Sequence, residues 1–417
     1  MRVTRFKLVN LRAIEALEFK FQPGFNLIVG VNGVGKTSVL DALAVCLSAV
    51  VKDANRLRTP VDSFGLDDIR IGADSLTLEC GFGIGQTEYT YLIHKPRTTS
   101  APQEKKAGMP RQQVHETPEH TEYLGERPKP ATGKEAEGRP LAILFSTRRA
   151  VPSERAPAKS VAAGGIPAAY AEAFSNRELR LGEFAAWMRV QQALKSENPK
   201  SGRVLVAFEA AVRRFLPEYK NLRVDDGARP RLLIDHGTTT LQVRQLSDGE
   251  RGTLAMVLDL TRRLAQASPS MKDPAATAEA VVMIDEIDLH LHPQWQRRIV
   301  RDLTAAFPKC QFITTTHSPQ VIGEVDHERI QIISEGQVFS PLHSFGVDSS
   351  RVLEEIMDAR PRTEVVQALL SEISVAVGNK NLGRAKEVLV KLITQVGESD
   401  PEVIRNRTLL EFMGNEK

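Results

Sequence analysis

The stretch Gly30-Val31-Asn32-Gly33-Val34-Gly35-Lys36-Thr37 decides the fold. It fits the pattern G-x-x-x-x-G-K-[ST] at every position, and it lies between an apolar run at residues 26–29 and a segment with helical periodicity. Glycines let backbone N–H groups approach an anion closely, and the N-terminus of the following helix adds partial positive charge. We therefore predict a phosphate-binding loop between a strand and a helix, with a nucleoside triphosphate as its ligand.

The side chains of this loop have separate expected roles. Lys36 is expected to reach the β- and γ-phosphates as a catalytic residue, and the Thr37 hydroxyl is expected to hold Mg²⁺. ATP and Mg²⁺ are therefore the predicted cofactors. The other positions predicted to contact the nucleotide are Gly30, Asn32, Gly33, Val34, Gly35 and Ser38.

A second apolar strand, at residues 281–284, ends in the carboxylates Asp285 and Glu286. At the end of this strand, Asp285 is predicted to hold the magnesium ion through water, and Glu286 to orient and deprotonate the attacking water. Many strands end in an acid, so this prediction depends on the phosphate loop being present as well. Because nearly 250 residues separate Lys36 from Asp285, a large insertion must lie between the two halves of the site.

Length and composition limit the alternatives. The 417 residues allow two or three domains, and 41% hydrophobic with 26% charged residues is ordinary for a globular protein. A net charge of +3 means that any basic surface for nucleic acid must be local. The three cysteines form no CxxC pair, so neither a zinc site nor a disulfide framework is indicated. With no signal-peptide pattern and no long apolar run, we expect a cytoplasmic protein without a membrane partner.

Periodicity along the chain predicts alternating strands and helices. A region at residues 95–140 contains seven prolines and few apolar residues, and is interpreted as a flexible insertion. The expected strands are residues 3–9 and 17–21 (a hairpin), 26–29, 76–82, 87–94, 141–145, 231–234, 239–243, 281–284 and 311–315. The expected helical segments are residues 36–51, 168–217, 248–267, 293–307 and most of the chain after 340.

A further motif, Leu246-Ser247-Asp248-Gly249-Glu250, precedes the helix at 248–267. By itself it is an ordinary helix start with Ser247 as N-cap. Placed just before the carboxylate strand, it resembles the signature motif of the ABC-type ATPases, in the branch that contains SMC, RecF and OLD proteins. That motif is usually LSGGE or LSGGQ, so Asp248 departs from it. The resemblance implies that Ser247, Gly249 and Glu250 contact nucleotide.

Other motifs follow in the order that this family shows. Residues 285–293 resemble its carboxylate motif and D-loop, although His292 stands where many relatives carry Asp. Thr316-His317-Ser318-Pro319 resembles the switch-histidine segment, which makes His317 an expected γ-phosphate sensor. Arg12 resembles an arginine that contacts phosphate in SMC-like proteins. No convincing Q-loop glutamine is found, and residues 146–149 occupy roughly that place.

The resemblance covers about residues 1–50 and 240–345 and implies an α/β fold. We expect an ABC-ATPase head at 1–345, with a mixed sheet around the phosphate-loop core and an antiparallel β subdomain. A helical insertion at 168–217 and a C-terminal helical domain at 346–417 complete the predicted organisation. In this family the signature helix caps the ATP of a second subunit, so the resemblance also implies an ATP-bridged dimer or a higher oligomer, with nucleotide state as the switch.

Three classes of function compete within the family. Residues 285–295 (DEIDLHLHPQW), 315–322 and 345–350, with the helical tail, resemble the PtuA ATPases of Septu-type anti-phage defence systems, and similar ATPases accompany some retrons. Such ATPases bind and restrain an HNH-type nuclease. The tail is therefore either a docking surface for this partner or a lid that completes the core.

The second class is a RecF- or SMC-like repair ATPase that clamps DNA, which would need a basic track and leaves DNA or RNA as a possible partner. Arg148, Arg149, Arg155, Arg177 and Arg180 are the candidates for that track. The third class, an OLD-type nuclease, needs a Toprim domain with a Glu and a D-x-D motif. The chain contains no D-x-D, so we expect an ATPase without nuclease activity of its own.

Overall fold

The computed structural model describes residues 1–57, 61–98, 118–129, 139–150, 166–176, 178–357 and 362–415. These residues divide into two compact units, Met1–Ser349 and Ser350–Lys417. Among them, no helix combines the length and the hydrophobicity needed to traverse a lipid bilayer. The three cysteines, Cys46, Cys80 and Cys310, are free and buried.

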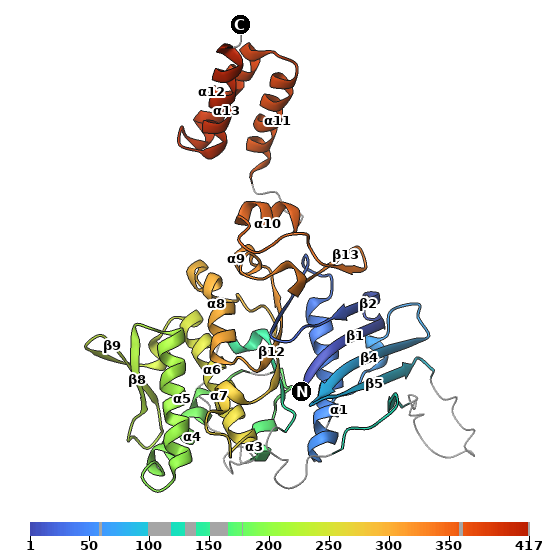
Figure 1. The fold of residues 1–417 in the computed structure, drawn as a ribbon, viewed down its shortest axis with the longest axis vertical. Coiled ribbons are helices and arrows are strands. Elements are labelled where there is room, and N and C mark those ends of the chain that lie inside the picture. The colour runs from blue at the N-terminus through green and yellow to red at the C-terminus, as the bar shows by residue number, and fades with distance from the viewer. Residues whose placement is uncertain are drawn as a thin grey trace, which may run out of the picture. The chain divides into compact units, whose positions relative to one another are not determined.

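A mostly parallel sheet forms the centre of the first unit (Figure 1). Its three central strands are buried at every residue, which explains why they read in the sequence as almost continuous apolar runs. All pairs in it are parallel except that of β14 with β13. The strand order is β14 (Gln337–Phe339), β13 (Ile330–Ser334), β3 (Phe25–Val29), β12 (Cys310–Thr316), β11 (Ala280–Ile284) and β7 (Ala142–Phe145).

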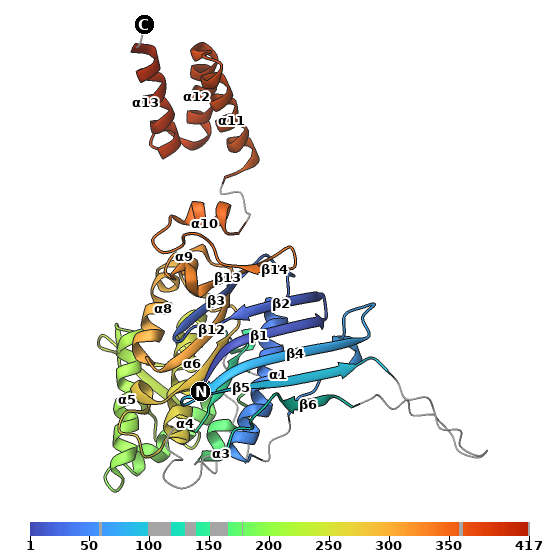
Figure 2. The same ribbon diagram turned by 45° about the vertical axis from the view of Figure 1, so that its right-hand side comes forward.

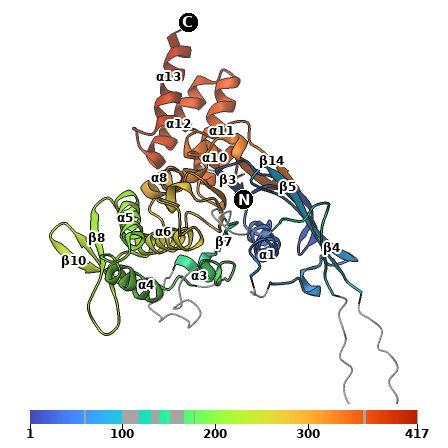
Figure 3. The ribbon, with the colours of Figure 1, turned by 60° about the horizontal axis from the view of Figure 1, so that its bottom comes forward.

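An antiparallel sheet covers the long helix α1 (Lys36–Asn55), which packs against strands of both sheets (Figure 3). The expected hairpin is confirmed, with Phe6 opposite Phe19 in the register of its two strands. The strand order is β2 (Ile14–Lys20), β1 (Arg2–Leu11), β4 (Ser75–Ile84), β5 (Thr87–Pro96) and β6 (His120–Tyr123).

The interpretation of residues 95–140 as a flexible insertion is wrong at β6. This short strand pairs with β5, and the rings of Tyr91 and Tyr123 lie 4.9 Å apart. Because β6 is short and its side chains are largely exposed, it carries no apolar pattern that the sequence could reveal. Residues 99–117 and 130–138 of the same region lie outside the described residues.

The expected helical insertion forms a lobe beside the central sheet (Figure 2). It also contains a small antiparallel sheet, of which β8 was not predicted. Its helices are α3 (Ile166–Tyr170), α4 (Leu181–Ala193) and α5 (Pro199–Phe215), and its strands are β8 (Tyr219–Val224), β9 (Leu232–His236) and β10 (Thr239–Gln242). The chain continues through α6 (Asp248–Ala267), α7 (Pro274–Thr277), α8 (Pro293–Ala306) and α9 (Pro319–Ile322) to α10 (Ser349–Glu355).

Three helices of the second unit share a core of their own, after α10, which spans the boundary between the units. Ile373, Ala385, Val388, Leu392 and Val403 are fully buried in that core. The helices are α11 (Glu364–Gly378), α12 (Leu382–Val396) and α13 (Pro401–Asn415), in agreement with the helical pattern expected for the tail.

Candidate functional site

Four neighbouring parallel strands deliver the predicted site residues to one edge of the central sheet. β3 leads into the phosphate loop, β12 ends before His317, β11 ends before Asp285, and β7 ends before Ser146. Parallel strands have their carboxyl ends at the same edge of a sheet, where ligands of open α/β sheets bind. Sheet topology therefore brings together residues that are far apart in the sequence.

The phosphate loop is closed around its own lysine. Lys36 is 6% exposed, and its ammonium group donates to the carbonyl oxygens of Gly30 at 2.9 Å and Val31 at 3.0 Å. A Cβ atom at Gly30 would lie 2.8 Å from the carbonyl oxygen of Ile333, so this position requires glycine. Gly35 has φ +99°, a conformation that side chains disfavour, directly before α1 begins.

Thr37 and Asp285 join the two halves of the site. The Thr37 hydroxyl donates to one oxygen of Asp285 at 3.0 Å, and the Thr315 hydroxyl donates to the other at 2.7 Å. Asp285 is 4% exposed. Hydroxyl and carboxylate oxygens are the ligands that Mg²⁺ prefers, and the nucleotide supplies phosphate oxygens beside them. The residues present therefore fit a magnesium ion held by Thr37 and Asp285.

Glu286 lies in a turn where its backbone has a strained conformation. Its φ is +49°, in the left-handed region that few residues other than glycine visit. Its N–H donates to the Thr315 hydroxyl at 2.7 Å, and its carbonyl accepts from Arg149 at 2.6 Å. Burial lowers the pKa of Lys36, whereas the carboxylates of Asp285 and Glu286 raise it, so these charges face one another across the site.

Arg149 is a residue of the site that sequence reasoning missed. It is 6% exposed, and its guanidinium donates to the carbonyl oxygens of Ser146, Asp285 and Glu286. Burial lowers the pKa of Arg149 to about 10, so the group remains charged at neutral pH. The one feature of the sequence that pointed to Arg149 is its position shortly after an apolar strand, where ABC-type ATPases carry their Q-loop. Nothing in the sequence indicated which atoms it would contact.

His317 follows β12 and lies half-buried beside the phosphate loop. Burial lowers its pKa, and so does the charge of Lys36, whereas the carboxylates of Asp288, Glu286 and Asp285 raise it. The net effect keeps the imidazole neutral at pH 7. A neutral imidazole can donate one hydrogen bond to a phosphate oxygen, which is compatible with the predicted sensor role.

Arg12 lies next to the start of α1. Its guanidinium donates to the Ser38 hydroxyl at 3.1 Å and to the carboxylates of Asp68 at 3.0 Å and Asp41 at 3.4 Å. Arg12 also has a left-handed backbone, with φ +50°, and its N–H donates to the carbonyl of Asp68. The structure therefore brings Arg12 to Ser38, one of the positions predicted to contact the nucleotide.

The signature segment makes its contacts elsewhere. Ser247 caps α6 in a reciprocal pair with Glu250, whose carboxylate also accepts from the Tyr219 hydroxyl at 3.1 Å. A Cβ atom at Gly249 would lie 2.4 Å from the carbonyl oxygen of His290, so only glycine fits there. The segment thus packs on the turn that follows the carboxylates. No hydrogen bond or ion pair among the described residues joins it to its own phosphate loop.

Two of the three described arginines of the predicted basic track are engaged in contacts within the protein. Arg149 is buried in the site, and Arg180 pairs with Glu183 at 2.7 Å and with Glu172. Arg148 is exposed, whereas Arg155 and Arg177 lie outside the described residues.

Comparison with known proteins places this geometry in context. Residues 167–323 match a family model described as "AAA domain, putative AbiEii toxin, Type IV TA system", and residues 5–133 match an "AAA domain" model. The chain is 34% identical over 227 residues to the Retron Ec83 probable ATPase of Escherichia coli, a match that spans 53% of this chain and 42% of the relative. It is 31% identical to the Retron Vc95 probable ATPase of Vibrio cholerae over 43% of this chain and 37% of the relative.

A shorter match, 41% identical over 21% of this chain and 12% of the relative, is to the Septu protein PtuA of Bacillus mycoides. The chain therefore spans less than half the length of these curated relatives. Among solved structures, an SmcHead bound to the C-winged helix domain of ScpA matches with a TM-score of 0.50 and 15% identity, over 82% of this chain and 98% of that chain. The expected fold, an α/β ABC-ATPase head with a mixed sheet, is confirmed.

Proposed function

We propose, from the premise that the chain is an SMC- and RecF-like ATPase related to the retron and Septu ATPases, that it binds and hydrolyses ATP as a molecular switch. One observation carries the proposal. The Thr37 hydroxyl donates to the Asp285 carboxylate at 3.0 Å across 248 residues of sequence, directly before Glu286. This contact assembles the phosphate loop and the hydrolytic carboxylates into one site.

The residues of the site divide the chemistry between them. Lys36 and the N-terminus of α1 bind the phosphates, because an ammonium group and unpaired backbone N–H groups attract an anion. Thr37 and Asp285 would hold Mg²⁺, which neutralises phosphate charge when it is bound. Glu286 orients a water molecule and takes its proton. His317, which is neutral at pH 7, donates to a phosphate oxygen, and Arg12, beside Ser38, also contacts phosphate.

The signature segment supports an ATP-bridged dimer. Ser247 and Asp248 are exposed at the N-terminus of α6 and contact no nucleotide-binding residue of the phosphate loop among the described residues of their own chain. Such a helix start attracts the phosphates of a nucleotide that a second copy holds. ATP would then join two copies and its hydrolysis would separate them, which makes nucleotide state the switch.

The proposed setting is an anti-phage defence complex in which this ATPase controls an HNH-type nuclease. The retron and PtuA relatives support that setting. The cleavage activity is assigned to the partner chain. The three-helix unit at Ser350–Lys417 is the proposed docking surface, because it folds around its own core.

A RecF- or SMC-like clamp on DNA is the alternative, and the fold of the head favours it. That function needs a positive track for the phosphate backbone. Of the arginines assigned to such a track, Arg149 is buried and Arg180 is paired with Glu183 and Glu172, so the clamp is the weaker candidate.

The substitution Glu286→Gln tests the proposal. It keeps the size of the side chain but removes the base, so ATP should still bind, while turnover should fall by about a hundredfold or more. ATP-bound copies should then accumulate as dimers in size-exclusion chromatography with light scattering. The matched control is Glu335→Gln, in an exposed turn between β13 and β14, which should leave turnover unchanged. Unchanged hydrolysis in Glu286→Gln would exclude the role given to Glu286.

A further inference from the structure

A groove of about 650 Å³ opens between helices of the head and shares no residue with the nucleotide site. α5 forms one wall, and the segment 272–276, which includes most of α7, forms the other. The C-terminal end of α8 closes one side, and α6 contributes the buried Thr261 to the floor. The helices around it are α5 and α6, which pack side by side in the lobe seen in Figure 3.

Small apolar side chains dominate the interior of the groove. Val206 projects into it and is 68% exposed. Such short side chains let a second backbone approach closely, as helix packing requires. The alanines of the lining come from three helices: Ala207, Ala210 and Ala211 from α5, Ala275 and Ala276 from α7, and Ala305 and Ala306 from α8.

The polar groups inside the groove already have partners. The Thr261 hydroxyl donates to the carbonyl of Val257 at 2.8 Å. Asp273, the one acid among the described lining residues, accepts from the N–H of Ala276 at 3.2 Å as the cap of α7. A ligand in this groove therefore gains little from hydrogen bonding to its floor, and apolar contact decides what binds there.

Positive charge surrounds this apolar interior. Lys195, Arg203 and Arg214 stand along the α5 side, and Lys272 stands on the opposite wall. All four are exposed, and none forms an ion pair within the part of the chain that the structure describes. The neighbouring Arg213, by contrast, is not among the lining residues and pairs with Glu209 at 3.3 Å. These four cations outnumber Asp273, the one acid among the described lining residues, so the groove carries a net positive charge.

The groove wall formed by α5 is long enough for a short helix of a partner to lie along it. Arg203, Val206, Ala210 and Arg214 recur at helical spacing on one face of α5. At 1.5 Å per residue, Arg203 and Arg214 are about 16 Å apart along the axis, which is about three helical turns. Arg298 of α8 donates to the carbonyl of Phe215 at 2.7 Å and so fastens α8 to the end of α5. The groove is therefore held open before any ligand arrives.

We infer that this groove binds an amphipathic helix of a partner protein, with apolar residues on one face and acidic residues on both flanks. The apolar face would fill the alanine-lined interior, and the acids would meet Lys195, Arg203, Arg214 and Lys272. No exposed aromatic side chain is among the described lining residues, so single-stranded nucleic acid has no surface on which its bases can stack. The groove would give the proposed ATPase switch a surface for a protein partner. Binding of the partner helix in the groove can be tested independently of ATP hydrolysis.

A pair of synthetic peptides with the full chain tests this inference. Both are helix-stapled and about four turns long, with leucines on one face; one carries glutamates on its flanks and the other carries lysines at the same positions. Fluorescence anisotropy measures their binding to wild type, to the double variant Arg203→Glu/Arg214→Glu, and to the control Arg213→Glu. ATP turnover of each variant shows that the head remains folded, because none of these residues lies in the nucleotide site.

The glutamate peptide should bind wild type and Arg213→Glu equally, and should lose about tenfold or more in affinity for the double variant. The lysine peptide should bind the double variant better than wild type, because its charges then complement the groove. Ala210→Trp places a large side chain in the groove and should lower the affinity of the protein for either peptide. The inference is overturned if wild type does not bind the glutamate peptide, if Arg213→Glu weakens binding as much as the double variant, or if a single-stranded oligonucleotide displaces the peptide.

Discussion

Arg149 holds the turn that carries Glu286, the proposed catalytic base. Its guanidinium donates to the carbonyls of Asp285 and Glu286, and the backbone of Glu286 is left-handed. We expect Arg149→Lys to lower kcat for ATP by about tenfold to a hundredfold, because one ammonium group cannot replace a planar fork and small displacements of a base are costly. The KM for ATP should change little, since Lys36 and Thr37 are untouched.

Steady-state kinetics separate these two constants, and the exposed neighbour provides the matched control Arg148→Lys. A normal kcat in Arg149→Lys would show that Arg149 has no part in holding the turn. A loss confined to KM would instead place Arg149 among the phosphate-binding residues.

His317 should stay neutral through the neutral range. Burial and the charge of Lys36 lower its pKa, so the imidazole should titrate below its ordinary value of about 6.5. The folded state then binds this proton less readily than the unfolded state does, so its contribution to stability is complete above about pH 6.5 and is lost as the pH falls. An NMR titration of the histidines checks this. In Lys36→Met the pKa of His317 should rise, and an unchanged value would show that the two groups are not coupled.

At the residue scale, the sequence predicts the position of a site residue when that residue belongs to a recognisable local motif. Lys36, Thr37 and Asp285 lie together because the phosphate loop and the carboxylate strand are each recognisable alone and the sheet brings their ends together. Arg149 could not be predicted, because its partners are backbone carbonyls that every residue carries. The role of Gly249 likewise depends on the carbonyl of His290, which only the folded structure places against it.

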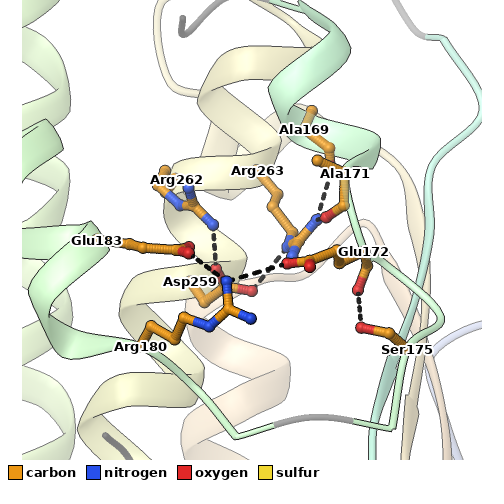
Figure 4. Close-up of polar contacts among 9 residues, drawn as sticks. All are labelled: Ala169, Ala171, Glu172, Ser175, Arg180, Glu183, Asp259, Arg262 and Arg263. Atoms are coloured by element: carbon orange, nitrogen blue, oxygen red, sulfur yellow. Dashed lines mark hydrogen bonds and ion pairs between the residues drawn. The ribbon is translucent and has the colours of Figure 1, made fainter. Parts of the chain in front are cut away.

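Among the elements, α6 is anchored by a buried group of charges (Figure 4). Asp259 pairs with Arg262 and Arg263 of the same helix. Arg263 also donates to the carbonyls of Ala169 in α3 and of Ala171 directly after it. Although burial raises the pKa of Asp259, the guanidiniums of Arg263 and Arg262 outweigh it and hold that pKa below its ordinary value. The carboxylate therefore stabilises the fold above about pH 4, and this contribution is lost as the pH falls.

Replacing this carboxylate should destabilise the head strongly. Asp259→Asn leaves two buried guanidiniums without their counter-charge, so we expect the free energy of unfolding to fall by about 3 kcal/mol or more. The control Asp248→Asn lies at the exposed end of the same helix, where an ion pair with Arg251 contributes about 0.5 kcal/mol or less. Urea unfolding followed by circular dichroism compares the two. Equal effects would mean that the buried charges do not anchor α6.

Helices and strands are predicted correctly where the sequence shows both their apolar periodicity and the residues that mark their ends. The bounds of α6 agree with the prediction because Ser247 and Glu250 form a capping box that marks its start. β8 was missed because its pattern includes three polar residues, Lys220, Asn221 and Arg223, and its register with β9 shifts between Lys220 and Arg223. β6 was missed for a related reason, since an exposed edge strand needs no apolar alternation.

On the scale of the whole molecule, the two units present separate cores. The unit Met1–Ser349 contains the proposed nucleotide site, whereas the described core at Ser350–Lys417 is built from α11, α12 and α13. A chain that ends at Met357 should therefore still bind and hydrolyse ATP. Turnover assays on this shortened chain check that expectation, and loss of ATP binding would show that the tail completes the site.

The tail should also fold without the head, although with little stability to spare. A fragment of residues 362–415 is small, and domains of this size rarely exceed about 5 kcal/mol from their cores. Leu392→Ala removes a fully buried side chain at a cost of about 2–5 kcal/mol, so it should unfold the fragment, whereas Val390→Ala, 62% exposed on the same helix, should not. Thermal melts by circular dichroism distinguish the two variants. An unfolded wild-type fragment would mean that the helices depend on the rest of the chain, and the tail would then be part of the ATPase head rather than a separate docking unit.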